Sequence, residues 1–466
     1  MKAKLMKTRI LALLLVLFML TGTFYACNSD PKDAGNAAGG GAGENAAGEN
    51  SAGSESESDI LAIINIQDYT IIYPKDSIGL EQASADYLSD YISDKTGKKL
   101  SVADDGSAEG QYEILIGDTN RSSSKEAAGL NYGENDLLIK ADGAKVVLYG
   151  KDLMAAGAVG QFISQYIGDA DIQVSKSAGI VKFEMKDLKN AILMIGDGMG
   201  FSHVELAKSN GLASFKAEFL PNKGEIITDS LSSGATDSAA AATALACGWK
   251  TTNGYVGMNK AKEPVKTVRE LAYEIGYKTA IVTTDSLDGA TPAAFLAHIN
   301  DRNKSKEIYE QIDEVKANEG DMVYVAGTSD KPVFDDFKAA LKQISTDSKG
   351  FFMMFEEGYI DKYAHSNEAD PVVKCVSRYD EAIAYTIAFV MAHPDTALII
   401  TADHETGGLK IQDDGTFKFT SGDHTRVNVP MYTWGKGTEI FGSAQENTEV
   451  AKFIANIFGE SNFGQE

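Results

Sequence analysis

The stretch AILMIGDGMG, residues 191–200, decides the fold, because an unbroken run of five apolar residues ends at a glycine that Asp197 follows. Such a run is typical of a strand buried on both faces of a sheet. Comparable runs lie at residues 279–282, 322–325, 351–355, 397–400 and 429–433, and helical patterns such as 265–275 and 371–392 separate them. The sequence therefore predicts the α/β class, with a mostly parallel sheet covered by helices on both faces.

Polar residues recur just beyond the ends of these predicted strands. In open α/β sheets, ligand sites lie where the carboxyl ends of the strands meet. We therefore expect a site at that edge of the sheet. The polar residues that follow the strands are Asp197, Asp288, Thr291, Glu356, Glu357, Asp403 and His404.

Three of the six histidines lie beside carboxylates, in the pairs Asp361 with His365, Asp403 with His404, and Asp423 with His424. Asp361 and His365 are four residues apart, so one helical turn can bring both to a single ion. A donor set of carboxylate and imidazole suits zinc better than calcium or magnesium, which prefer oxygen alone. The other histidines, at positions 203, 298 and 393, lack such neighbours and are interpreted as structural.

The stretch TDSAAAATALACG, residues 236–248, places an Asp-Ser pair in front of a run of small residues. Alanine favours the helix, so we expect one over residues 239–246 with Thr236 or Asp237 near its N-cap. Ser238 then lies in the first turn, where unpaired N–H groups and the helix dipole favour an anion. A capped, closely packed alanine helix without chemistry is the alternative interpretation.

The N-terminal residues predict export instead of a folded segment. Lys2, Lys4, Lys7 and Arg9 precede an apolar run at 10–20 that is too short to span a membrane, so residues 1–26 are interpreted as a signal peptide. Cys27 follows in a context that resembles a bacterial lipoprotein processing site, which predicts a lipid-anchored protein at the cell surface. An ordinary secretory signal cleaved near Ala26 is the alternative.

Two domains and a tail fit a chain of 466 residues. Residues 27–58 are rich in Gly, Ala, Ser and Glu and are expected to form a disordered tether. Residues 59–186 are expected to form a small α/β domain, with strands at 69–73 and 112–116, helices at 80–96 and 154–167, and a hairpin at 136–149. Residues 187–466 are expected to form the catalytic domain.

Charge and cysteine content exclude some functions. The formal net charge of −24 argues against nucleic acid as a partner, so an anionic substrate would need locally bound cations. Cys247 and Cys375 lie in predicted helices and are expected to be buried thiols. The small domain weakly resembles accessory domains of bacterial carbohydrate-active enzymes through IIYPKDS, YISDKTGKKL and EILIGDTNR, and this resemblance supplies no site.

Six segments occur in the order and approximate spacing of the alkaline phosphatases: ILMIGDGMG, TDSAAAATALACG, GATPAAFLAHINDR, EEGYIDKYAH, TADHETGG and GDHT. The resemblance covers roughly residues 190–435. It implies the alkaline phosphatase fold and hydrolysis of small phosphomonoesters. The reaction would pass through a phosphoserine intermediate, and each of its two steps would invert the configuration at phosphorus. By analogy with a family that is often dimeric, it also offers a homodimer as one assembly.

The resemblance assigns roles to single residues. Ser238 would be the nucleophile, and Arg302, eleven residues beyond Thr291, would bind two phosphate oxygens with its forked guanidinium. The first zinc would be held by Asp361, His365 and His424. The second would be held by Asp197, Asp403 and His404, together with Ser238.

A third ion, magnesium, is implied at Asp197, Thr291 and a glutamate, for which Glu356 is preferred over Glu357 because it stands five residues before Asp361. The family usually carries an Asp or His two residues before Thr291, where this chain has Gly289, and Asp288 is one residue off. Lys362 matches the form of the family that goes with magnesium. We therefore expect a weak magnesium site.

Two other functions stay open from the sequence. One is a phosphodiesterase, phosphonate hydrolase or sulfatase of the same superfamily, although the TDSAA segment does not resemble a sulfatase motif. The other is a surface-anchored binding protein whose hydrolase domain has decayed. A complete set of ligand residue types argues against decay.

Overall fold

A computed structural model describes residues 60–63, 66–77, 79–167, 172–176, 179–320, 322–328 and 333–465. These residues belong to one compact unit, 55–466. The predicted signal peptide, Cys27 and the tether lie outside the described residues, and the division at 186 and 187 stays a prediction. No helix in the described ranges is both long and apolar enough to cross a membrane.

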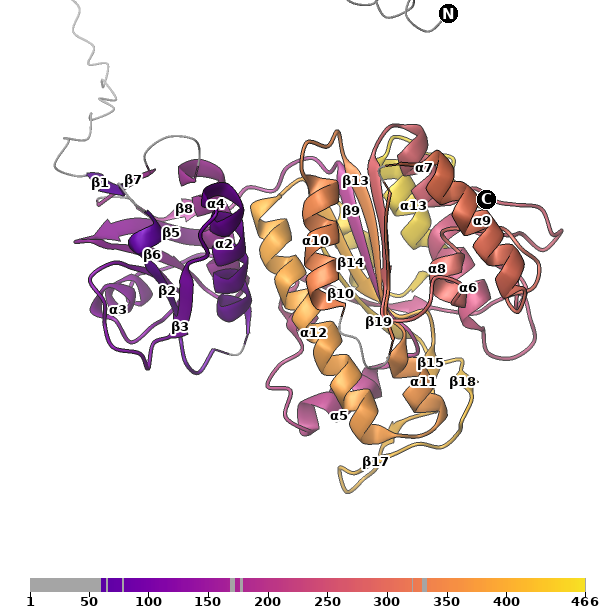
Figure 1. Cartoon of the computed structure of the whole chain (residues 1–466). Coiled ribbons are helices and arrows are strands. Elements are labelled where there is room, and N and C mark those ends of the chain that lie inside the picture. The colour runs from indigo at the N-terminus through magenta and orange to yellow at the C-terminus, as the bar shows by residue number, and fades with distance from the viewer. Residues whose placement is uncertain are drawn as a thin grey trace, which may run out of the picture. The chain divides into compact units, whose positions relative to one another are not determined.

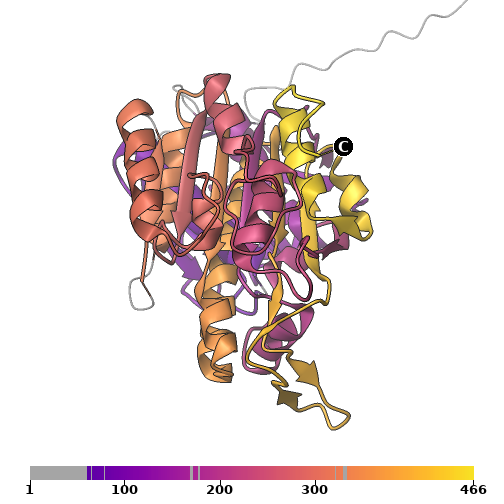
Figure 2. The ribbon, with the colours of Figure 1, turned by 90° about the vertical axis from the view of Figure 1, so that its right-hand side faces the viewer.

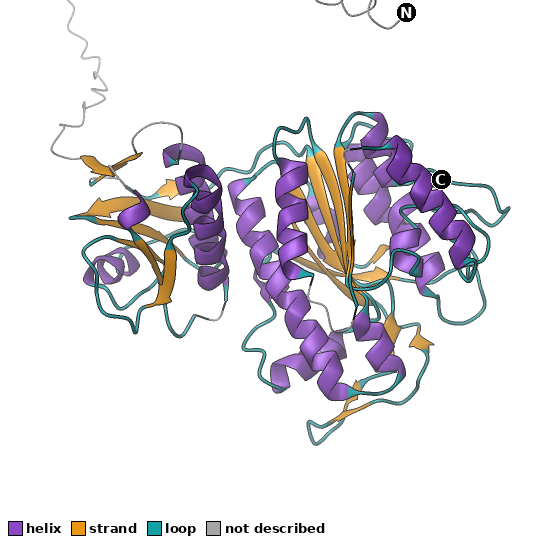
Figure 3. Ribbon diagram, in the orientation of Figure 1, coloured by secondary structure: helices purple, strands orange, loops and turns teal. Residues whose placement is uncertain are grey.

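The predicted apolar runs form six adjacent strands of an eight-stranded sheet, one of them at its edge (Figures 1 and 3). Seven of the eight strands run in the same direction and only β19 runs the other way, so the mostly parallel α/β fold is confirmed. In spatial order the strands are β12 (Val323–Ala326), β11 (Lys278–Thr283), β13 (Phe351–Glu357), β9 (Asn190–Gly196), β14 (Thr396–Thr401), β19 (Val429–Trp434), β10 (Asn222–Ile227) and β20 (Gln445–Glu446).

Helices cover both faces of this sheet (Figure 1), as the continuous apolar strands require. One face carries α10 (Phe334–Ser345) and α12 (Ala369–Ala392). The other carries α6 (Ser238–Cys247), α7 (Val268–Glu274), α8 (Ala290–Ala293), α9 (Ser305–Asn318) and α13 (Thr448–Ile457). The buried free thiols of Cys247 in α6 and Cys375 in α12 confirm that expectation.

The carboxyl ends of the parallel strands lead into short elements that gather at one end of the sheet (Figures 1 and 2). β9 leads into α5 (Phe201–Ser209), and β13 leads into α11 (Tyr359–His365). Beyond β14 come two small antiparallel pairs, β15 (Glu405–Thr406) with β18 (His424–Thr425) and β16 (Lys410–Ile411) with β17 (Phe417–Lys418). Short 3-10 helices occur at η2 (Ile66–Asp68), η3 (Lys216–Phe219) and η4 (Thr438–Gly442).

The N-terminal part contains a second, six-stranded sheet close to the prediction. The predicted helix at 80–96 is α2 (Leu80–Thr96), and the predicted hairpin is β5 with β6. The strands in spatial order are β3 (Ser101–Asp104), β2 (Thr70–Tyr73), β4 (Glu113–Ile116), β6 (Lys145–Gly150), β5 (Asp136–Asp142) and β8 (Val181–Lys182). The remaining elements are α3 (Ser122–Ala128), α4 (Leu153–Tyr166) and the pair β1 (Ile60–Ile63) with β7 (Ile172–Ser175).

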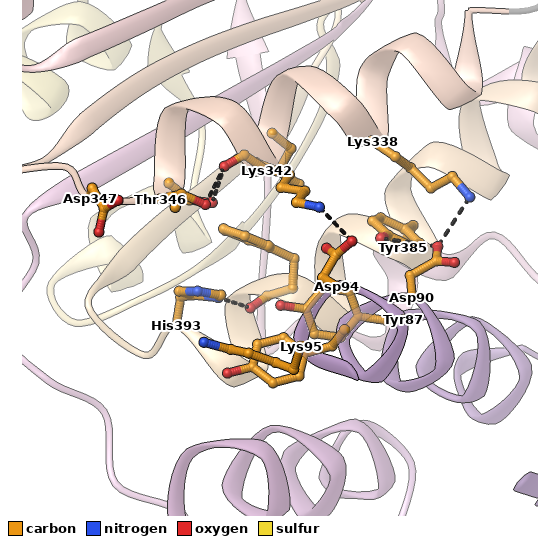
Figure 4. A pocket seen from close by; sticks show the side chains of 14 residues that line it. Tyr87, Asp90, Asp94, Lys95, Lys338, Lys342, Thr346, Asp347, Tyr385 and His393 are labelled. Atoms are coloured by element: carbon orange, nitrogen blue, oxygen red, sulfur yellow. Dashed lines mark hydrogen bonds and ion pairs between the residues drawn. The ribbon is translucent and has the colours of Figure 1, made fainter. Parts of the chain in front are cut away.

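Ion pairs tie α2 to α10 across a cavity of about 390 Å³ that α2, α10 and α12 line (Figure 4). Lys338 Nζ lies 3.1 Å from Asp90 Oδ2, and Lys342 pairs with Asp94. Tyr385 of α12 donates a hydrogen bond to Asp90 Oδ2 at 3.4 Å. None of the predicted site residues lies in this cavity, so we interpret it as part of the seam between the two sheets.

α4 packs so closely on α12 that Gly160 has no room for a side chain. A methyl group built on Gly160 would lie 2.1 Å from the backbone oxygen of Met391. Gly157, one turn earlier, would place its methyl 3.1 Å from Met391 Cε, at the flexible end of a side chain. A side chain at Gly160 would therefore push the backbones of α4 and α12 apart, whereas one at Gly157 would displace only side-chain atoms.

We expect Gly160→Ala to lower the free energy of unfolding by about 1–3 kcal/mol, the usual cost of overpacking. Gly157→Ala should be close to neutral, because the roughly 1 kcal/mol by which alanine favours a helix offsets its tight contact. Urea denaturation of both variants measures the difference. Equal stability of the two proteins would contradict the close packing of α4 on α12.

Candidate metal centre

Asp361, His365 and His424 form the first of two groups that could hold a metal ion. α11 places Asp361 and His365 one turn apart, and β18 supplies His424. Asp361 Oδ2 lies 3.3 Å from His365 Nε2, Asp361 Oδ1 lies 3.5 Å from His424 Nε2, and the two Nε2 atoms are 3.1 Å apart. The sequence spacing of Asp361 and His365 had predicted their pairing.

Backbone carbonyls fix which nitrogen of each histidine faces the ion. His365 Nδ1 donates to the carbonyl of Gly422 at 2.6 Å, and His424 Nδ1 donates to the carbonyl of Thr236 at 2.8 Å. The Nε2 atoms are then left as ligands, the usual arrangement in metal centres. A hydrogen bond with Asp361 raises the pKa of His365 to about 9, so a bound cation would have to displace a proton there.

Asp197, Asp403 and His404 form the second group, and all three side chains are buried. His404 Nε2 lies 3.3 Å from Asp403 Oδ2 and 3.7 Å from Asp197 Oδ1. Burial, followed by the charges of Asp403 and Asp361, raises the pKa of Asp197 well above its usual range. The protein alone thus leaves this cluster of carboxylates electrostatically unfavourable.

One oxygen of each aspartate in the second group makes no hydrogen bond with any described residue. The backbone N–H groups of Gly198 and His404 donate to Asp403 Oδ1, at 3.1 and 2.9 Å, while Asp403 Oδ2 has no such donor. Asp197 Oδ1 is likewise buried without a hydrogen bond. Buried polar atoms are normally satisfied, so these two oxygens fit a bound cation.

Gly198, the first glycine of the segment DGMG, lets the two groups of candidate ligands lie close together. Gly198 has a φ of +74°, and a methyl group there would lie 2.8 Å from Asp361 Cα. The rings of His404 and His424 stack with centroids 3.6 Å apart, which joins the second group to the first. The residues that the sequence assigned to two zinc ions therefore form one continuous cluster.

Ser238 is the first residue of α6, and its Oγ lies 3.2 Å from His404 Nε2. Asp237 is the N-cap, as expected, and accepts a hydrogen bond from the N–H of Ala240 at 3.0 Å. Every residue of α6 is buried. The small residues are needed because this helix must bring its N-terminal turn to a crowded centre within the fold.

Arg302 reaches the centre by way of the same cap residue. Its Nη1 lies 3.2 Å from Asp237 Oδ2, which also accepts from the N–H of Gly254 at 2.9 Å. Asp237 therefore caps α6 and orients Arg302 at once. The sequence analysis found only the capping role, because nothing in the spacing of the two residues shows that they meet.

The two adjacent glutamates at the end of β13 point to opposite faces, as strand geometry dictates. Glu357 Oε1 accepts from Arg378 Nη2 at 2.9 Å and from Thr284 Oγ1 at 3.1 Å. Glu356 lies on the other face, where Thr283 donates to it and the Thr291 hydroxyl lies close by. The geometry thus brings Glu356, the residue preferred from the sequence, to the predicted third site.

Thr291 adds a hydroxyl oxygen to the predicted third site. Its Oγ1 donates a hydrogen bond to Asp197 Oδ2 at 3.3 Å, which brings Asp197 to the same position. Burial raises the pKa of Glu356 to about 8, and nearby carboxylates contribute to the rise. Asp288 does not join them, since Ser286, Ser305 and Tyr309 hydrogen-bond to its carboxylate. A different residue, Asp285, lies close to Glu356, and the sequence analysis missed it although it also follows a strand.

The sequence profile of the alkaline phosphatase family matches residues 188–325 and 318–420, which together make up half of the chain. The chain belongs to the alkaline phosphatase family. The match includes both Asp197 and the ligands on α11, and it ends just before His424.

Known members of the family are similar to this chain over the same region. Alkaline phosphatase 4 of Bacillus subtilis is 28% identical over 328 residues, which cover 56% of this chain and 71% of the relative. The alkaline phosphatase of the Antarctic bacterium TAB5 superimposes with a TM-score of 0.55 and 26% identity, covering 59% of this chain and 99% of that one. A variant of the TAB5 enzyme, with one histidine replaced by glutamate, superimposes with a TM-score of 0.54 and 26% identity over 60% of this chain and 100% of its own, and it was solved with magnesium in the site called M3.

Zinc should stabilise this protein, because a cation neutralises the crowded buried carboxylates. At a free zinc concentration about 100 times the Kd, the expected gain is about 2.7 kcal/mol over chelator-stripped protein. Differential scanning fluorimetry measures it as a rise in Tm. His365→Ala should lose most of this rise.

The matched control is His298→Gln, because His298 lies outside both groups and pairs with Glu270. It should lower Tm without zinc and keep the zinc-dependent rise. A rise in His365→Ala as large as that of the wild type would show that the first group does not hold zinc.

Proposed function

We propose that this protein hydrolyses phosphate monoesters through a phosphoserine at Ser238, with two zinc ions and an auxiliary magnesium. The proposal rests on one observation: Ser238 Oγ lies 3.2 Å from Nε2 of His404, a member of the second group of candidate ligands. Zinc in such a centre lowers the pKa of a bound hydroxyl and neutralises charge on the entering and leaving oxygens.

Ser238 is placed to attack phosphorus without a histidine acting as base. Its position at the N-terminus of α6 puts the positive end of the helix dipole behind the oxygen and the incoming phosphate. A bond forms between Oγ and phosphorus as the bond to the leaving oxygen breaks, and the proton of Ser238 passes to water. Water then displaces Oγ in a second in-line step, and the two inversions give retention overall.

Arg302 is proposed to hold two nonbridging oxygens of the phosphate. A guanidinium matches such a pair of oxygens with two parallel hydrogen bonds. The contact with Asp237 restricts the side chain, so less conformational entropy is lost when the phosphate binds. This favours a monoester, because a bound diester has one oxygen fewer to offer.

Magnesium is proposed to occupy the space between Asp197, Thr291 and Glu356. This donor set consists only of oxygen atoms, which hard cations prefer. Few carboxylates reach the position directly, so binding should be weak. The magnesium in the M3 site of the TAB5 variant is a parallel in a similar fold.

Ser238→Ala should reduce hydrolysis of p-nitrophenyl phosphate by several orders of magnitude, because it removes the attacking oxygen. Zinc content, measured by atomic emission after gel filtration, should stay close to that of the wild type because the carboxylate and histidine ligands remain. The exposed Ser209→Ala is the control and should keep full activity. Turnover by Ser238→Ala at the wild-type rate would exclude the phosphoserine mechanism.

Arg302→Ala should weaken kcat/KM for a monoester by roughly 10- to 100-fold, the equivalent of a charge-assisted hydrogen bond of about 1.5–3 kcal/mol. The loss on bis-p-nitrophenyl phosphate should be smaller. Lys304→Ala removes the same charge two residues away, on an exposed side chain, and should leave both rates unchanged. A larger loss on the diester than on the monoester would favour a phosphodiesterase.

A further inference from the structure

The carboxylate of Asp285 lies beside Gly289. Gly289 is the position at which the predicted magnesium site has no side chain. Gly289 is the N-cap of α8 and precedes Thr291 by two residues. A methyl group built on it would lie 3.2 Å from Asp285 Oδ2 and 2.9 Å from the backbone oxygen of Ser286. A carboxylate is therefore present at this place, although it comes from the end of β11 and not from α8.

Asp285 and Glu356 also lie together beside a second glycine, Gly358. A methyl group on Gly358 would lie 3.2 Å from Asp285 Cβ and 3.5 Å from Glu356 Oε1. Thr283 connects the two residues, because its Oγ1 accepts from the N–H of Asp285 at 2.9 Å and donates to Glu356. The two carboxylates are thus held side by side at the carboxyl edge of the sheet.

Lys362 holds the other oxygen of Asp285. Its Nζ lies 2.5 Å from Asp285 Oδ1 and 4.5 Å from the centre of the Tyr359 ring. Lys362 directly follows Asp361, so this ion pair links the end of β11 to the helix that carries the first group of ligands. The pair fixes the carboxylate of Asp285 with Oδ2 toward Gly289.

We infer that Asp285 is a positioning residue of the magnesium site, where its carboxylate orients the water molecules of the ion in place of a side chain at position 289. The inference rests on the proposed function. Magnesium keeps several waters and usually contacts only one or two carboxylates directly, so a neighbouring carboxylate acts by accepting hydrogen bonds from those waters. Asp197 lies at the same site through its other oxygen, Oδ2, which accepts from Thr291.

Asp288 provides a matched comparison, because it carries the same charge three residues away. Its carboxylate is engaged by Ser286, Ser305 and Tyr309, at the start of α9. Replacing Asp288 removes one negative charge from the neighbourhood without changing Asp285 or Glu356. An effect specific to Asp285 cannot then be ascribed to net charge alone.

The test is a magnesium titration of the zinc-loaded full chain. Isothermal titration calorimetry measures the Kd, and the magnesium-dependent shift in Tm is a second measurement. Asp285→Asn should raise the Kd for magnesium about tenfold, the typical loss when a group supporting a metal site is removed. Asp288→Asn should stay within about twofold of the wild type, because the carboxylate of Asp288 is already engaged by Ser286, Ser305 and Tyr309. Equal Kd values for Asp285→Asn and the wild type, or equal losses in the two variants, would overturn the inference.

Lys362→Met keeps the test decisive if Asp285→Asn does not fold, which circular dichroism would show. Without its ammonium group nothing holds Asp285 Oδ1, so the carboxylate is no longer fixed toward Gly289 and the Kd for magnesium should rise. A Kd that falls or stays the same in Lys362→Met would contradict the positioning role of Asp285.

Activity separates this inference from the proposed function. If the zinc-loaded wild type hydrolyses p-nitrophenyl phosphate but binds no magnesium, the inference is wrong and the zinc-dependent reaction stands. If it binds magnesium with the expected loss in Asp285→Asn yet hydrolyses no monoester, the inference stands and the proposed reaction is wrong.

Discussion

The structure depends on one electrostatic constraint, the burial of several carboxylates at the carboxyl edge of a single sheet. Asp197, Asp403 and Glu356 extend from neighbouring strands, and burial raises the pKa of Asp197 and Glu356. Without compensating positive charge such an arrangement opposes folding. Burial of these carboxylates therefore costs free energy, which the apolar strands beneath them must offset.

Local patterns in the sequence predicted the parts of this centre that depend on strand and helix periodicity. Asp197 and Asp403 were found because each follows an apolar run, and Asp361 with His365 because four residues make one helical turn. The same reasoning identified α6 and its cap, because alanine content and an Asp-Ser pair are local signals. The ranges predicted for β5, β6 and α2 agree with the structure for the same reason.

Contacts between distant segments could not be predicted in this way. Asp237 meets Arg302 across 65 residues, and Asp285 meets Lys362 across 77, and neither spacing follows a helix or strand period. The orientation of Glu356 against Glu357 was likewise decided by Arg378, which reaches Glu357 from α12. α12 also packs on α2 and α4, so one long helix serves both sheets, a role that its apolar pattern alone did not reveal.

The stacked rings of His404 and His424 lie 3.6 Å apart, with each imidazole assigned to a different group of ligands. Neither ring can rotate without displacing the other, and the carbonyl of Thr236 holds His424 from behind. The two groups are therefore in direct contact through their rings. A ligand that turned the imidazole of one group would also shift the donor nitrogen that the other group presents.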